Sequence, residues 1–238
     1  MMTSMVTVWA LLIFLTLVLA KAYAYWRRRT TIKRWYKSLS INKHLVYFQH
    51  LFSDIDGFLL SRQSRALNNA IEYTYGEIDF ISFTALLSMA KPDCNTVFYD
   101  LGSGTGKAVL ACAMVFNVKK SCGIELFNLL HQTALKQQHR LQKLPDYVDK
   151  TNVLYFINAD FLHVDLSDAT LIFINATAFF GETWVAVNQH LKQMPTGTII
   201  ITTSKRLFAD AFSVIKVTSV QMSWGIVYAY IQQRIAPE

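Results

Sequence analysis

The chain has 238 residues, which suits one sizeable domain and is too short for two large ones. Charged residues make up 16% and apolar residues 53%, so the composition excludes intrinsic disorder and favours a search for a membrane segment. The net charge of +7 is unevenly placed, because residues 1–53 hold eight Lys and Arg and no acidic residue. Residues 54–238 are close to neutral, so the basic character belongs to the amino-terminal segment.

The amino-terminal segment combines an apolar run with a basic cluster. Residues 5–20 carry no charge, and extension to Trp26 adds only Lys21. A helix of this length reaches about 33 Å, the hydrocarbon thickness of a bilayer. Arg27–Arg29 follow directly, which by the positive-inside rule puts the remaining chain in the cytoplasm. The pattern predicts a single-pass transmembrane anchor with a basic cytoplasmic flank over residues 1–29.

Other interpretations of this segment stay open. Ala20-Lys21-Ala22 resembles a signal-peptidase site, although no positive residue precedes the apolar run. A buried core helix is a second alternative, and binding of nucleic acid by the basic residues is a third. Whether the segment is retained or cleaved is not determined by the sequence.

The remaining chain alternates between apolar runs and helix-length amphipathic stretches. This alternation follows a connector over residues 30–70, expected to be helical, and is typical of a mostly parallel sheet covered by helices. The last stretch, residues 212–232, predicts an antiparallel pair that turns near Trp224-Gly225. The expected strands are 96–100, 121–125, 153–159, 170–175 and 198–202, and the expected helices are 106–116, 129–144 and 182–194.

A glycine-rich turn, residues 100–107, joins the first strand to its helix and reads Asp-Leu-Gly-Ser-Gly-Thr-Gly-Lys. A P-loop is excluded because Leu101 and Ala108 replace its first glycine and its hydroxyl residue, and the dinucleotide fingerprint lacks its last glycine at Lys107. What remains is Asp-x-Gly-x-Gly-x-Gly, the turn associated with S-adenosylmethionine. The cofactor-binding residues expected here are Asp100, Gly102, Gly104, Gly106 and Lys107.

Two further acidic residues follow strand ends. Glu125 ends the second strand, where a carboxylate accepts hydrogen bonds from ribose hydroxyls. Asp160 follows the third strand, where it accepts from an adenine amino group while Phe161 covers the ring. Together with Asp100, these acids fall at three successive strand ends on the ligand side of an open sheet. No metal site is expected, because the six histidines show no ligand spacing and Cys94, Cys112 and Cys122 fit neither a zinc ribbon nor a disulfide scaffold.

A resemblance becomes specific at two further motifs. Tyr75-Gly76-Glu77 lies before the first strand, and Asn175-Ala-Thr-Ala-Phe179 follows the fourth. With the glycine loop and the strand-end acids, residues 72–208 resemble the disruptor-of-telomeric-silencing family of non-SET histone-lysine methyltransferases. The resemblance implies a class I, Rossmann-like α/β fold with a seven-stranded sheet, here over residues 71–238, and S-adenosylmethionine as cofactor.

The resemblance also implies residue roles. Tyr75 and Glu77 would close over the methionine part of the cofactor, and Asp100 with Gly102 would hold its amino and carboxylate groups. Asn175 would lie beside the departing methyl group, and Phe179 would line the lysine channel. The implied catalytic residues are therefore Asn175, Tyr75 and Phe179, and from its type the Asn175 side-chain oxygen is expected to orient the amine.

Departures from the family leave the acceptor open. Lys107 replaces an amide residue, and Ala176 and Thr177 replace a second Asn and an aromatic. Since the domain is near neutral, a nucleosome or nucleic acid is expected to be an unlikely partner. The anchor with a methyltransferase domain is also similar in layout to the lysine methyltransferases of the ATP synthase c-subunit. A membrane-associated protein lysine is the expected acceptor, with a small amine, a lipid headgroup or cofactor binding without catalysis as alternatives.

Overall fold

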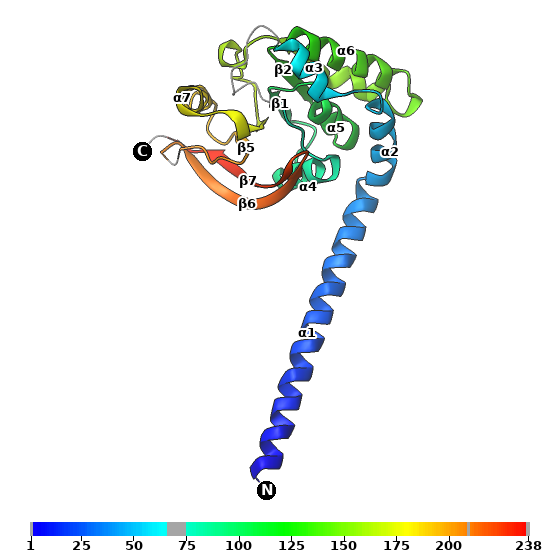
Figure 1. Ribbon diagram of the computed structural model, residues 1–238, viewed down its shortest axis with the longest axis vertical. Helices are drawn as coiled ribbons and strands as arrows, with labels where there is room; N and C mark the ends of the chain where they lie inside the picture. The colour runs from blue at the N-terminus through cyan, green and yellow to red at the C-terminus, as the bar shows by residue number, and fades with distance from the viewer. Residues whose placement is uncertain (1, 66–74, 209, 237–238) are drawn as a thin grey trace. The chain divides into compact units, whose positions relative to one another are not determined.

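The computed structural model describes residues 2–65, 75–208 and 210–236, without the side chains of residues 2–8 and 10. The chain divides into two compact units, residues 1–42 and 43–238, and the second holds the sheet (Figure 1). The helices are α1 (Met2–Ser38), α2 (Ile41–Leu51), α3 (Gly57–Ser64), α4 (Phe80–Ala90), α5 (Lys107–Val115), α6 (Asn128–Gln142) and α7 (Gly181–Leu191). The strands are β1 (Val97–Leu101), β2 (Lys120–Glu125), β3 (Leu154–Asn158), β4 (Leu171–Ile174), β5 (Ile199–Thr203), β6 (Phe212–Met222) and β7 (Gly225–Arg234).

Helix α1 corrects the prediction for the amino-terminal segment. Across the part of the chain that the structure describes, no helix is long and apolar enough to cross a membrane. The described α1 side chains form an uncharged run only over residues 11–20, which spans about 15 Å of helix, and Lys21 and Arg27–Arg29 follow it. The predicted single-pass anchor and the cytoplasm-facing membrane localisation are therefore wrong. The expected membrane association of the substrate rested on that anchor and loses its basis.

The sheet confirms the predicted α/β class. Its seven strands run in the order β3-β2-β1-β4-β5-β7-β6, with parallel pairing from β3 to β5 and antiparallel pairing of β7 with β5 and β6. The last two strands form the hairpin that was predicted to turn at Trp224-Gly225. This order reverses between β1 and β4, and ligands of open α/β sheets bind beyond the strand ends at such a reversal.

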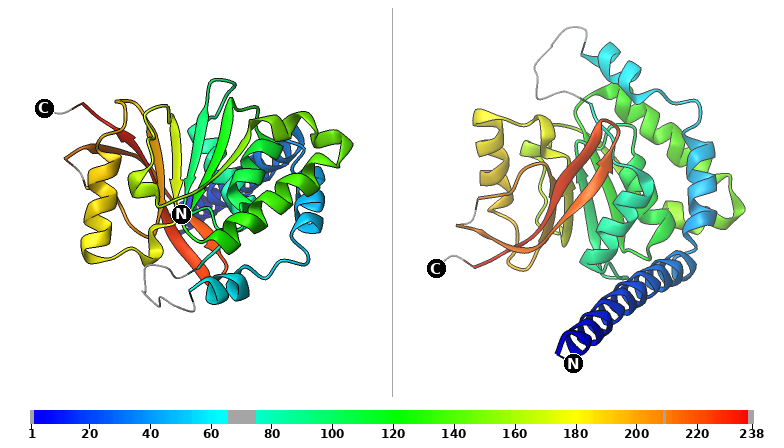
Figure 2. Two further views of the ribbon diagram at one scale, coloured as in Figure 1. Left: turned by 90° about the horizontal axis from the view of Figure 1, so that it is seen from above. Right: turned by 60° about the horizontal axis from the view of Figure 1, so that its bottom comes forward.

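Helices cover both faces of the sheet (Figure 2), and neighbouring side chains on β1 contact opposite layers. Phe98 faces α4, where Phe83 packs edge-on against both Phe98 and Phe173 of β4. Tyr99 faces the opposite side and belongs to the buried cluster that includes Val187 of α7. Successive strand residues point to opposite faces, and all five residues of β1 are buried, so both faces of this strand are covered.

The tip of the β6–β7 hairpin meets the segment that precedes α4. Ile78 forms an isolated bridge to Met222, and the Ser223 N–H donates to the Glu77 carbonyl at 2.8 Å. A Cβ atom on Gly76 would overlap the Trp224 ring, so glycine allows the two segments to lie this close. The hairpin thereby positions the Tyr75–Glu77 motif. The sequence did not predict α4 or this contact.

Candidate active site

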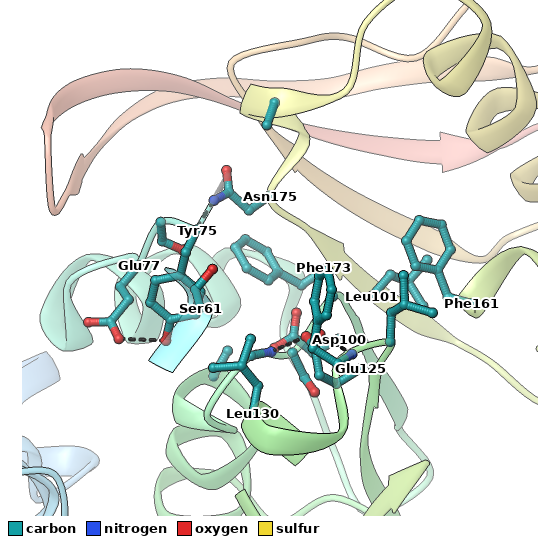
Figure 3. A pocket seen from close by; sticks show the side chains of 18 of the residues that line it. Ser61, Tyr75, Glu77, Asp100, Leu101, Glu125, Leu130, Phe161, Phe173 and Asn175 are labelled. Atoms are coloured by element: carbon teal, nitrogen blue, oxygen red, sulfur yellow. Dashed lines mark hydrogen bonds between the residues drawn. The ribbon is translucent and has the colours of Figure 1, made fainter. Parts of the chain in front are cut away.

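A cavity opens at the carboxyl ends of β1, β2 and β4, the edge predicted for the ligand (Figure 3). In Figure 3, Tyr75 and Glu77 lie on one side and Phe161 on the other. The cavity brings together all but one of the residues predicted for the site. Its lining includes Tyr75, Glu77, Asp100, Gly102, Gly104, Lys107, Glu125, Asp160, Phe161, Asn175 and Phe179.

Gly106 is the predicted residue that does not line the cavity. It lies in the left-handed region at φ +85° and caps the start of α5. A Cβ atom there would lie 2.9 Å from Ala134 and from the Phe156 ring, so glycine allows α5 to pack closely against its neighbours. Gly102, at φ +81°, would place a Cβ in open space instead, which leaves room for a ligand beside it.

Two buried carboxylates form the floor of the cavity. Asp100 is 4% exposed, and burial together with the nearby Glu125 raises its pKa to about 8. Burial also raises the pKa of Glu125, whose oxygens accept from the backbone N–H groups of Gly104 at 2.8 Å and Phe127 at 2.9 Å. The pair therefore favours a bound cation or hydrogen-bond donors that compensate for its charge.

Lys107 forms a charged network with the Tyr-Gly-Glu motif. Its ammonium pairs with Glu77 Oε2 at 2.5 Å, and the Tyr75 hydroxyl donates to Glu77 Oε1 at 2.6 Å. Burial, followed by the charge of Glu77, raises the pKa of Tyr75 well above its usual value. Among the described residues that line the cavity, Lys107 is the only Lys, Arg or His. This side chain is therefore the natural partner for an anionic group of a ligand.

Phe161 lies at the opposite side of the cavity from Tyr75 (Figure 3), and Asp160, the residue before it, also lines the cavity. Asp160 Oδ1 accepts from the Leu162 N–H at 2.9 Å and thereby caps a short 3-10 helix, Phe161–His163. The ring of Phe161 packs edge-on against Phe179, with centroids 5.9 Å apart. The cavity therefore contains the aromatic ring of Phe161 and the carboxylate of Asp160, the two groups that were expected to bind an adenine ring.

Asn175 lines the cavity, and its side-chain oxygen, which was expected to orient the amine, accepts hydrogen bonds from two residues of the protein. Its Oδ1 accepts from the hydroxyl groups of Thr177 at 2.9 Å and Thr203 at 2.6 Å, and its Nδ2 donates to the Gly76 carbonyl at 3.3 Å. Both acceptor positions of the side-chain oxygen are therefore taken by protein hydroxyls. Asn175 instead ties the ends of β4 and β5 to the Tyr-Gly-Glu segment.

Several lining residues were missed by the sequence analysis. Ser61 reaches the cavity from α3. Asp56 caps the start of this helix, because its side chain accepts from the Leu59 N–H at 2.9 Å. Phe173 and Leu130 add apolar surface from β4 and α6. The Asp-x-x-Leu cap was a readable sign of a helix start, but no local signal showed that this helix would reach the site.

The residue types fit S-adenosylmethionine. The cofactor has a cationic ammonium, an anionic carboxylate, two ribose hydroxyls and an adenine ring, and the cavity offers Asp100, Lys107, Glu125 and Phe161 with Asp160 for these groups. The open space beside Gly102 and the compensation that the buried carboxylates require are independent signs of the fit.

Comparisons with solved structures place the fold. An RNA methyltransferase from Salinibacter ruber, solved with S-adenosyl-L-homocysteine, aligns over 66% of this chain and 92% of its own length with a TM-score of 0.53 and 20% identity. TrmN from Thermus thermophilus aligns over 74% of this chain and 53% of its own length with a TM-score of 0.54 and 15% identity. At these identities the similarity shows the fold alone, which is that of class I methyltransferases.

Comparisons of sequence place the family. The chain is 31% identical over 139 residues to a protein of Caenorhabditis elegans named histone-lysine N-methyltransferase, H3 lysine-79 specific. It is 29% identical over 90 residues to a protein-lysine N-methyltransferase of Saccharolobus islandicus. These alignments cover 56% and 37% of this chain, but only 15% of the nematode protein and 50% of the archaeal one.

The family model described as "Histone methylation protein DOT1" matches residues 60–227. This range contains the whole described lining of the cavity, from Ser61 to Thr183. The predicted resemblance and the predicted cofactor are confirmed at the level of the family. The chain belongs to the DOT1 family of histone methylation proteins, which are S-adenosylmethionine-dependent methyltransferases.

Proposed function

We propose that this chain transfers the methyl group of S-adenosylmethionine to the side-chain amine of a protein lysine. The observation that carries the proposal is the coincidence of the family match with the cavity, since every described lining residue falls inside residues 60–227. The names of the nematode and archaeal relatives both specify lysine as the methylated residue, which supports the same acceptor here.

The chain's own residues would bind the cofactor across the strand ends. Asp100 would hold the ammonium, Lys107 the carboxylate, Glu125 the ribose, and Asp160 with Phe161 the adenine. Gly102 and Gly104 would let the backbone approach the ligand, while Tyr75 and Glu77 close over its methionine part. The sulfonium supplies an activated methyl group, so the protein mainly has to align a nucleophile and exclude water.

At the acceptor end, apolar surface would favour the neutral amine that attacks. A lysine amine near pKa 10.4 must lose its proton, and an apolar channel lowers this pKa because it disfavours the ammonium. Phe173 and Phe179 provide such surface in the cavity. Asn175, held by Thr177 and Thr203, would fix the shape of this end and is proposed as a positioning residue.

The relatives' names also bear on the partner. The name of the nematode relative specifies lysine 79 of histone H3, which goes against the expectation that a nucleosome is an unlikely partner. Histones are therefore among the proteins to test first. The near-neutral charge of residues 54–238 gives the domain itself little electrostatic affinity for nucleic acid.

The test uses purified full-length chain and cofactor with a labelled methyl group. Nucleosomes, free histones, a total protein extract, small primary amines and lipid vesicles serve as separate acceptors. We expect label on lysine Nε atoms of protein, located by peptide mass spectrometry and abolished by Asp100→Asn together with Glu125→Gln. Label confined to small amines or lipid would replace the proposed acceptor. Cofactor binding without transfer to any acceptor would contradict the activity.

A further inference from the structure

Lys205 follows β5 and places its ammonium among three groups that bind cations. Its Nζ donates to the Phe179 carbonyl and lies 3.4 Å from the centroid of the Phe180 ring and 6.0 Å from that of Trp184. A carbonyl oxygen supplies a hydrogen-bond acceptor, and aromatic faces attract a cation through their quadrupole. The structure thus contains a lysine side chain seated in a small cation site.

This cation site adjoins the acceptor end of the cavity. Phe179 contributes both the carbonyl that holds Lys205 and part of the cavity lining. Ser204, the residue before Lys205, has φ +65° and hydrogen-bonds through its hydroxyl to Thr177 at 2.7 Å. Thr177 in turn donates to Asn175. The segment that carries Lys205 is therefore linked through two hydrogen bonds to the residue proposed to shape the acceptor end.

The contacts of Lys205 are of a kind that another amine can replace. No carboxylate among the described residues lies within ion-pair distance of its Nζ, whereas Lys107, Lys120 and Lys192 each have such a partner. Partial burial lowers the pKa of the Lys205 amine. Phe180 is 58% exposed, so an incoming side chain can reach the same ring face.

We propose that the Phe179 carbonyl and the rings of Phe180 and Trp184 form a docking site for the ammonium of the acceptor lysine, and that Lys205 occupies this site when no acceptor is bound. The inference rests on the proposed lysine methyltransferase function and adds to it the position of an entrance site. Lys205 is then an internal competitor of the substrate, and its removal opens the site. The acceptor lysine binds here as a cation, releases its proton to solvent water at the exposed Phe180 side, and then enters the cavity as the neutral amine.

The test measures binding of n-butylammonium, which has the end of a lysine side chain without its backbone. Saturation-transfer NMR reports its affinity for the full chain with no need for methyl transfer. We expect Lys205→Met to raise this affinity roughly two- to fivefold, the range that a solvent-facing cation–π contact contributes. Adding Phe180→Leu to Lys205→Met should remove the gain. The matched control is Lys216→Met, the same change on the exposed edge strand β6, which should leave the affinity as in the wild type.

A second measurement connects the site with turnover. For a lysine peptide that the wild type methylates, Lys205→Met should lower KM by a similar factor and change kcat less. Equal n-butylammonium affinity in Lys205→Met and wild type, or a gain that survives Phe180→Leu, would overturn the docking site. If the site binds n-butylammonium as expected but no lysine is methylated, the proposed function fails and the binding site stands.

Discussion

The two ends of the cavity are built in different ways. The proposed cofactor end consists of strand termini and the turn that follows β1, so Asp100, Gly102 and Glu125 are placed by the sheet and its first turn. The acceptor end is assembled from side chains that contact one another across segments far apart in the chain. Asn175, for example, is held by Thr203 and by the Gly76 carbonyl.

The difference has a physical basis. At the proposed cofactor end, the backbone conformation itself positions the residues, through the positive φ angles of the glycine turn and the parallel register of the strands. At the proposed acceptor end, the position of Asn175 depends on several side-chain hydrogen bonds that must form together. Substitutions at the first end should therefore affect stability and cofactor affinity, and those at the second should affect turnover.

The largest effect is expected for Gly106→Ala. Its φ of +85° costs an alanine about 1–2 kcal/mol, and overlap with Ala134 and Phe156 adds about 1–3 kcal/mol of overpacking. Urea unfolding should show a loss of roughly 3 kcal/mol in the free energy of unfolding. Gly102→Ala is the matched control, because its φ is similar and its Cβ would meet nothing within 4 Å. Equal losses in both variants would mean that packing at Gly106 does not matter.

Glu125→Ala should weaken cofactor binding by roughly 1.5–3 kcal/mol, the scale of one charge-assisted hydrogen bond. The structure adds a cost in stability, since Glu125 also accepts the Gly104 N–H that shapes the loop. Calorimetric titration with the cofactor and urea unfolding should both change. Unchanged affinity would remove Glu125 from the site.

These two positions show how much of the molecule the sequence predicted. The strands, the loop and the strand-end acids follow from local patterns, and the structure places each within a residue or two of its expected position. Gly106 was assigned to the cofactor because the motif contains it, although a Cβ atom at this position would meet Ala134 and Phe156. Local pattern alone does not separate a glycine that approaches a ligand from one that approaches a helix.

The acceptor end was predictable only in part. Asn175 was identified through the resemblance of residues 175–179 to the family motif, but its partner Thr203 is 28 residues away and carries no motif. Ser61 and α4 were missed for the same reason, since their place depends on tertiary contacts. The prediction for the amino-terminal segment was wrong for another reason. An apolar run with a basic flank is a local pattern that predicts a membrane anchor, but no described helix is long and apolar enough to be one.

Thr203→Val should lower turnover several-fold while cofactor affinity stays close to that of the wild type. The change keeps the shape of the side chain and removes the hydroxyl that donates to Asn175 Oδ1, at a cost of about 1 kcal/mol for one hydrogen bond. Steady-state kcat and a cofactor titration separate the two effects. The same substitution at Thr218 on β6 controls for the loss of a hydroxyl. If Thr203→Val had the same kcat as the wild type, the hydrogen bond from Thr203 to Asn175 would not matter for turnover.

Lys107→Gln should weaken S-adenosylmethionine binding about tenfold, because it removes the single described cation of the cavity lining. A decarboxylated cofactor gives the control, since it lacks the group that Lys107 is proposed to bind. Wild type should bind this analogue more weakly than the cofactor, and Lys107→Gln should discriminate less between the two. The same discrimination in both proteins would assign Lys107 only to its pair with Glu77.

The smallest expected effect is a change in bound protons at Asp100. Burial and Glu125 raise its pKa from the usual 3.8 to about 8 in the folded chain without ligand. The unfolded chain therefore releases this proton at lower pH than the folded one, so Asp100 makes the unliganded protein less stable as pH rises from about 4 to about 8. A cofactor ammonium favours the ionised carboxylate, so binding at pH 7 should release a fraction of a proton. Calorimetry in buffers of different ionisation enthalpy measures that release, and Asp100→Asn should lack it. A release that persists in Asp100→Asn would assign the proton to Glu125, whose pKa is raised by the same burial.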